Sequence, residues 1–148
     1  MDAPVAFRLG TLATSVDYRD PTHPAKIAPG VDVISRGRLT LGIGAGYFET
    51  EYRQCGWEFP ARPAVRIRQM EEAVRLTLAV WTERRKTFHG RYFHVEDAIL
   101  GPKLVHKSRP LVIIAVFAAL QPRQSAVTGA VCSGDRPIPL KAEPIEET

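Results

Sequence analysis

The sequence predicts an α/β fold built on parallel strands, and three stretches carry that prediction. Residues 39–43 are short, apolar and bounded by glycines, as expected of a strand that is buried on both faces. Residues 64–82 repeat apolar side chains every three or four positions, which is the pattern of a helix that packs on a core. Residues 110–115 form an uninterrupted β-branched run, which predicts another buried strand.

A glycine-rich segment follows the first of these strands. Gly42, Gly44 and Gly46 remove three side chains within five residues. Because glycine weakens a strand and packs nothing, this pattern favours a surface where backbone approaches a cofactor over a packed core. A dinucleotide-binding loop is a poorer interpretation, since its glycines open a helix and an acid follows about 20 residues on.

Five stretches, taken in order, resemble the luciferase-like family of flavin- or coenzyme F420-dependent monooxygenases and oxidoreductases. They are RLGTLAT (8–14), DVISRGR (32–38), LGIGAGY (41–47), EEA with LAVWT (71–73 and 78–82) and FHGRYF (88–93). The resemblance implies a (β/α)8 TIM barrel, which typically needs about 250 residues, whereas this chain has 148. We therefore expect a central fragment: a partial barrel with about strands three to five, intervening helices and a β-hairpin, truncated at both ends.

The other elements follow from local signals. Residues 7–14 read as a buried parallel strand, the third of the barrel. The resemblance implies a bulge there with a non-proline cis peptide between Thr11 and Leu12, although the residues themselves favour an ordinary strand. A helix over 24–34 contains Pro29 and Gly30, so we expect it to be damaged or very short. Residues 86–95 predict a β-hairpin that turns at His89 and Gly90.

Residues 45–63 predict a long loop that is rich in aromatic side chains. These aromatics could line the mouth of a substrate pocket or pack the loop against the barrel. Packing is the better interpretation for Trp57 and Phe59, and a pocket is the better one for Tyr47.

The resemblance ends near Ala115. Family members continue with a glycine pair and a helix that cradle the cofactor phosphate, but Ala115 and Val116 stand there in this chain. We therefore divide the chain into a partial barrel domain, 1–116, and an irregular tail, 117–148. A frameshift near codon 115 or a truncated gene would explain the tail, and a divergent phosphate-binding loop is the alternative.

The resemblance also implies a cofactor, either FMN or coenzyme F420, at the carboxyl ends of the strands. Thr11 and Leu12 would pack behind its ring, and Ala45, Gly46 and Tyr47 would line its edge. No catalytic residue can be assigned, because a tyrosine with a pKa near 10 is a poor proton shuttle where some relatives carry an acid. The implied activity is oxidation–reduction of a small organic substrate. The alternative is a truncated, inactive remnant or a self-associating fragment.

Composition and charge limit the classes of partner that the chain is expected to bind. The net charge of +4 comes from dispersed basic residues, which argues against nucleic-acid binding. The two cysteines are not spaced as metal ligands, and no apolar stretch reads as a membrane span. No charged-then-apolar leader precedes Phe7, so we expect a cytoplasmic protein. Unpaired sheet edges would favour a homo-oligomer.

Overall fold

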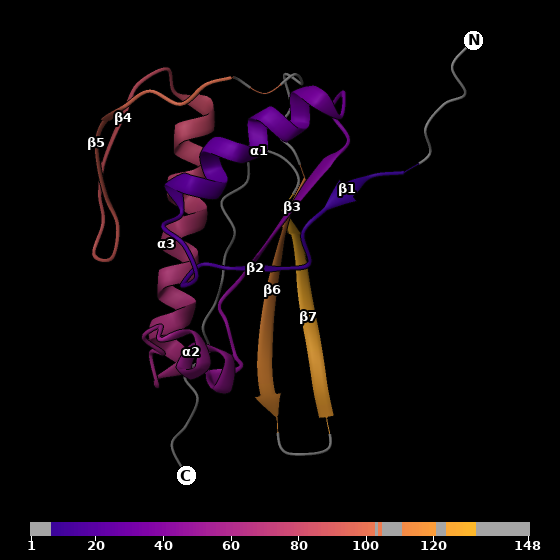
Figure 1. Ribbon diagram of the computed structural model, residues 1–148, viewed down its shortest axis with the longest axis vertical. Helices are drawn as coiled ribbons and strands as arrows, with labels where there is room; N and C mark the ends of the chain where they lie inside the picture. The colour runs from indigo at the N-terminus through magenta and orange to yellow at the C-terminus, as the bar shows by residue number, and fades with distance from the viewer. Residues whose placement is uncertain (1–6, 103, 105–110, 121–123, 133–148) are drawn as a thin grey trace.

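A computed structural model describes residues 7–102, 104, 111–120 and 124–132 (Figure 1). The elements, in chain order, are β1 (Leu9–Gly10), β2 (Thr14–Ser15), α1 (Thr22–Ile34), β3 (Leu39–Gly44), α2 (Glu49–Cys55), α3 (Pro63–Thr82), β4 (Lys86–His89), β5 (His94–Ala98), β6 (Leu111–Leu120) and β7 (Gln124–Cys132).

The main sheet has the order β1-β3-β6-β7, and β2 pairs with the same edge of β3 as β1 does. The strands β1, β2, β3 and β6 are parallel, with Thr40 opposite Leu111 and Gly44 opposite Ala115. The α/β fold with a parallel sheet is therefore confirmed. Figure 1 shows α1 and α3 beside this sheet and the β4–β5 hairpin on the far side of α3.

The core lies between the sheet and the helices α1 and α3. Alternate residues of β3, among them Leu41 and Ile43, pack with Met70 and Leu76 of α3 and with Ile114 of β6. Because side chains alternate along a strand, Thr40, Gly42 and Gly44 face the other side of the sheet. That second side carries the glycines that the sequence singles out.

Helix α1 is intact, so the prediction of a damaged or very short helix is wrong. It runs for 13 residues with Pro29 inside. A proline at 29 has no N–H to donate to the carbonyl of Ala25, four residues earlier. In the fold, the indole Nε1–H of Trp81 donates to that carbonyl at 2.8 Å. A side chain from α3 thus replaces the donor that the proline lacks.

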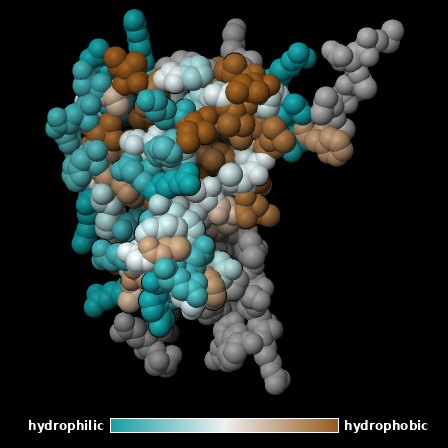
Figure 2. All heavy atoms as spheres, in the orientation of Figure 1, coloured by the Kyte–Doolittle hydropathy of each residue, from teal (hydrophilic) through white to brown (hydrophobic). Residues whose placement is uncertain are grey.

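Part of α1 is exposed and apolar. Ile27, Val33 and Ile34 are 48%, 42% and 84% exposed. Figure 2 shows apolar residues gathered over the upper part of the molecule, where Figure 1 places α1. The described residues cover Ile27 and Val33 only in part and leave Ile34 largely exposed, and the outer edge of β1 and β2 is unpaired within the described residues.

Helix α3 agrees with the sequence. The predicted hairpin also forms, but it turns over residues 90–93, and His89 belongs to β4, where it pairs with His94. The helix begins at Pro63, a favoured first position, and its partly buried Glu71 pairs with exposed Arg75. The carboxylate of Glu72 accepts hydrogen bonds from the backbone N–H groups of residues 91–93, at 2.8 to 3.0 Å. Glu72 therefore fastens the turn of the β4–β5 hairpin to α3.

Two regions differ from the sequence expectation. The predicted loop 45–63 contains the short helix α2, which ends at Gly56 with a φ of 70°. The predicted irregular tail is strand over 117–120 and 124–132, because the apolar run of β6 continues past residue 115 and β7 pairs with it antiparallel. Residues 121–123 and 133–148 lie outside the described part of the chain.

Candidate functional site

A bulge separates β1 from β2 at the position where the sequence predicts one continuous strand. The cis peptide bond joins Leu12 and Ala13, one position later than the resemblance implies, so the ordinary-strand interpretation is wrong. Thr11 fixes the bulge to β3, because its Oγ1 donates to the Gly42 carbonyl at 2.9 Å and accepts from the Gly42 N–H at 3.0 Å.

The glycines of β3 make room for this bulge. A Cβ at Gly42 would lie 2.1 Å from the carbonyl oxygen of Thr11, and one at Gly44 would lie 3.5 Å from the Cβ of Ala13. The sequence suggests that these glycines let backbone approach a cofactor. In the fold, the space beside them is filled by residues 11–13 of the chain itself, so their effect on a ligand would be indirect.

The bulge and the loop after β3 bring the five predicted site residues to adjacent strands. Leu12 is 86% exposed, an unusual state for a large apolar side chain, and Tyr47 is 60% exposed. Thr11 is exposed beside Leu12, while Ala45 is buried at the end of β3. We call residues 11–13 and 45–47 the platform.

Gly46 packs closely against the hydroxyl groups of Tyr52 and Ser15. It has a φ of +71°, and a Cβ there would lie 1.9 Å from the Oη of Tyr52 and 2.8 Å from the Oγ of Ser15. Only glycine fits this conformation and this contact without displacing a neighbour. Gly46 is thus a packing position as well as a predicted edge of the cofactor site.

Sequence reasoning missed the hydrogen-bonded group beneath Gly46. The Oη of Tyr52 lies 2.8 Å from the Oγ of Ser15 and donates to the Asp17 carboxylate at 3.1 Å. Burial raises the pKa of Asp17, against the opposing effects of the Tyr52 hydrogen bond and the Arg66 charge. Burial also raises the pKa of Tyr52 to about 12, so its hydroxyl stays protonated at neutral pH.

The aromatic residues of the loop after β3 pack around Tyr52. Its ring centroid lies 4.9 Å from that of Phe59 and 5.1 Å from that of Tyr18, and the Tyr18 ring lies 4.6 Å from Trp57. The guanidinium of Arg66 sits 4.5 Å from the centre of Phe59. These contacts agree with the packing interpretation of Trp57 and Phe59, and they leave Trp57 39% exposed.

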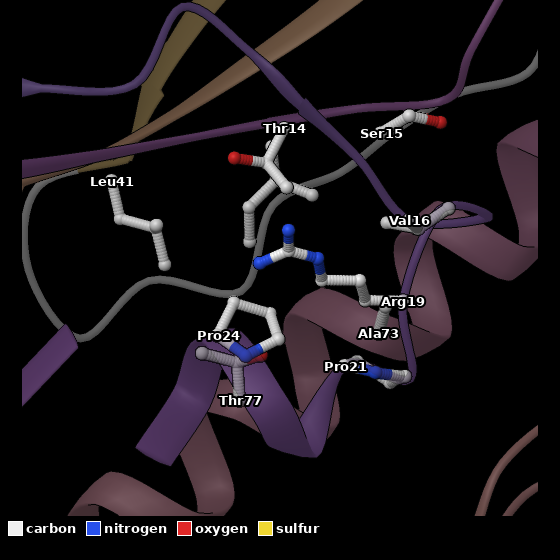
Figure 3. Close-up of a pocket in the computed structure, with 10 residues that line it drawn as sticks. Thr14, Ser15, Val16, Arg19, Pro21, Pro24, Leu41, Ala73 and Thr77 are labelled. Carbon is white, nitrogen blue, oxygen red and sulfur yellow. The ribbon is translucent and has the colours of Figure 1, made fainter. Parts of the chain in front are cut away.

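A small cavity lies on the other side of the sheet, toward the helices. Its volume of about 10 Å³ is close to the least that holds one water molecule. Figure 3 shows the Arg19 side chain reaching in among Thr14, Pro24 and Leu41. The cavity is too small for a flavin-sized ligand and is separate from the platform.

A family model described as Luciferase-like monooxygenase matches residues 6–147. The chain belongs to the luciferase-like monooxygenase family. The match runs on past residue 116.

Relatives in this family use two kinds of cofactor. An FMNH(2)-dependent dimethylsulfone monooxygenase of Pseudomonas putida is 29% identical over 90 residues, which cover 61% of this chain and 24% of the relative. An F420-dependent glucose-6-phosphate dehydrogenase of Intrasporangium calvum is 34% identical over 114 residues, 75% of this chain and 32% of the relative. The chain thus spans about a quarter to a third of the length of these relatives.

Solved structures give the same fold. An F420-dependent secondary alcohol dehydrogenase in complex with an F420-acetone adduct superposes with a TM-score of 0.63 at 26% identity, over 71% of this chain and 31% of that one. The monooxygenase RslO1 from Streptomyces bottropensis has a TM-score of 0.62 at 21% identity, over 72% and 31%. The luciferase-like barrels are therefore its structural neighbours.

Two further observations concern the described residues alone. None of their helices combines the length and the apolar character that crossing a membrane requires. Their His, Cys, Asp and Glu side chains nowhere gather in a group of three that could hold a metal ion.

Proposed function

We propose that this chain carries one wall of the cofactor site of a luciferase-like oxidoreductase. That enzyme would use reduced FMN or coenzyme F420 on a small organic substrate. The observation that carries the proposal is the bulge at residues 11–13, which is tied to Gly42 and presents Leu12 almost fully exposed.

The platform fits the ring of such a cofactor. Exposed Leu12 offers an apolar surface to the face of a flat ring, because burying that side chain removes apolar area from water. Tyr47, exposed beyond the end of β3, would place its aromatic side chain beside the edge of that ring. When bound, FMN or F420 would supply the hydride or oxygen chemistry, and the platform residues would orient the ring and shield one face from water.

The phosphate end of the cofactor fits less well. Backbone N–H groups at a helix N-terminus are what usually bind such an anion. Within 111–120 and 124–132, β6 runs on as strand to Leu120 and pairs with β7, so no helix begins in those residues. This observation favours the second candidate, a remnant that keeps the platform but does no catalysis alone.

A fluorescence titration separates the two candidates. FMN and F420 are titrated into the wild-type chain, a Leu12→Asp variant and an Ile34→Asp control. The control changes an apolar side chain of nearly equal exposure, 84% against 86%, that lies at the end of α1. Micromolar binding that Leu12→Asp weakens and Ile34→Asp leaves unchanged is the expected result. If a folded, monodisperse wild-type chain binds neither cofactor, the second candidate, a remnant that does no catalysis, is the better explanation.

Assembly and location belong to the same proposal. The unpaired outer edge of β1 and β2, together with exposed Ile27 and Ile34, supports self-association through this side of the molecule. Size exclusion at several concentrations tests it. We also propose a cytoplasmic location, and imaging of a tagged chain in cells would test it.

A further inference from the structure

We propose that Tyr52 is a positioning residue, which fixes the loop 45–47 to the end of β2 and so sets the edge of the platform. The mechanical part of this proposal stands on the structure alone. Its consequence for cofactor binding rests on the function proposed above.

The first support is a closed ring of hydrogen bonds. The Tyr52 hydroxyl donates to the Asp17 carboxylate at 3.1 Å, so at its 2.8 Å contact with Ser15 it accepts from the serine hydroxyl. The Asp17 backbone N–H lies 3.5 Å from the same Ser15 Oγ and points back to it. Each hydroxyl therefore donates once and accepts once, which defines a single orientation for the Tyr52 hydroxyl.

The second support is the contact between that hydroxyl and Gly46. The position that a Cβ would take on Gly46 is only 1.9 Å from the Tyr52 Oη. The loop backbone thus rests directly on the oxygen that Ser15 and Asp17 hold in place. If Tyr52 shifts, the oxygen that packs against Gly46 shifts too, and the adjacent residue Tyr47 moves with Gly46.

The third support is how rigidly Tyr52 is mounted. Tyr52 is fully buried, and its ring packs edge-on against Tyr18, Trp57 and Phe59. A fully buried hydroxyl with both hydrogen-bonding functions already used has none to offer a substrate. Tyr52 therefore acts through Gly46 and Tyr47 and does not itself touch the reacting atoms.

The test compares Tyr52→Phe with Tyr18→Phe. Both variants remove one phenol hydroxyl from the same aromatic cluster, but the Tyr18 hydroxyl bonds to Glu51 instead of supporting Gly46. Hydrogen exchange of the Val16 amide is the first readout, because this N–H donates to the Gly44 carbonyl at 3.0 Å and joins the ends of β2 and β3. We expect exchange about tenfold faster in Tyr52→Phe, and about unchanged in Tyr18→Phe. Equal effects in both variants would overturn the proposal.

A double-mutant cycle with Gly46→Ala isolates the contact itself. Alanine at 46 is strained by its positive φ in either background, so that effect cancels in the cycle. The clash with the Tyr52 oxygen exists only in the wild-type background. We expect Gly46→Ala to change the folding equilibrium constant about fivefold less when residue 52 is phenylalanine. Additive effects would contradict the contact.

Cofactor affinity completes the test. If the wild-type chain binds FMN or F420, Tyr52→Phe should raise Kd about three- to tenfold while Tyr18→Phe leaves it unchanged. If the wild-type chain binds neither, the proposed function fails, but exchange and the cycle still decide the role of Tyr52. Should Tyr52→Phe not fold, Ser15→Ala removes the other hydroxyl of the ring and should speed Val16 exchange in the same way.

Discussion

The carbonyl of Ala25 gives a sharp test of how α1 tolerates its proline. Trp81→Phe keeps an aromatic ring in the core but removes the indole N–H that donates to this carbonyl. Since Pro29 has no N–H, no backbone group can take over the bond. Ala25 is fully buried, so water does not reach the carbonyl either.

The expected loss of stability has two parts. A buried carbonyl left without a donor costs about 2 kcal/mol, within a range of about 1–3. The smaller ring adds about 1 kcal/mol of lost packing, because Trp81 is only 5% exposed. A total of about 3 kcal/mol corresponds to a fall in Tm of roughly 6–12 °C for a chain of this length.

Pro29→Ala supplies the matched background. An alanine at 29 restores the backbone N–H, so the Ala25 carbonyl keeps a donor when Trp81 is replaced. In that background Trp81→Phe should cost only the packing part, about 1 kcal/mol, which leaves a coupling of about 2 kcal/mol. Urea unfolding of the four proteins, followed by far-UV circular dichroism, measures it. Equal costs with and without Pro29 would refute the reasoning.

Four more substitutions follow from the same structure. Gly42→Ala should displace the bulge and cost more than about 3 kcal/mol of stability, because its Cβ would lie 2.1 Å from a backbone oxygen. Gly30→Ala is the control: open space surrounds that position, so the alanine should stabilise α1 by about 0.5–1 kcal/mol. Thermal unfolding of both variants measures the difference. Burial alone would raise the pKa of Glu72, but three backbone hydrogen bonds outweigh it and lower that pKa. Its stabilisation is therefore present above the unfolded-state pKa and lost as pH falls through the folded-state pKa, so Glu72→Gln should be less stable at pH 7 and equal to wild type in strong acid. Burial raises the pKa of Asp17, so the stability of the protein falls as pH rises from the unfolded-state pKa toward the folded-state pKa. Asp17→Asn keeps an acceptor for Tyr52 and should therefore be more stable than the wild type at pH 7, but not below the unfolded-state pKa of Asp17. The Tm values of the two proteins, measured at several pH values, would show this.

Local patterns predicted the elements whose signals are local. Helix α3 and strand β3 follow from their apolar spacing, and the hairpin follows from its turn residues and aromatic arms. Helix α1 was misjudged because the group that satisfies it, Trp81, lies 56 positions from Ala25 in the chain. The penalty of an interior proline depends on whether the fold supplies another donor, which no sequence window shows.

The candidate site was predictable only in part. Resemblance to a family located Leu12 and Tyr47, and their exposure agrees with a ligand-facing role that remains a prediction. The predicted position of the cis bond was one residue too early, because a bulge has no periodic signal that would locate it. The link between Ser15 and Tyr52 joins positions 37 residues apart, so only the folded chain reveals it.

The most direct test of the central claim is to map FMN and F420 binding residue by residue with two-dimensional NMR spectra of the labelled chain. The platform predicts saturable shift changes that concentrate at residues 11–13 and 45–47, with α1 unaffected. Saturable changes concentrated on another surface, or none at concentrations up to millimolar, would contradict the claim that these residues form a wall of the cofactor site.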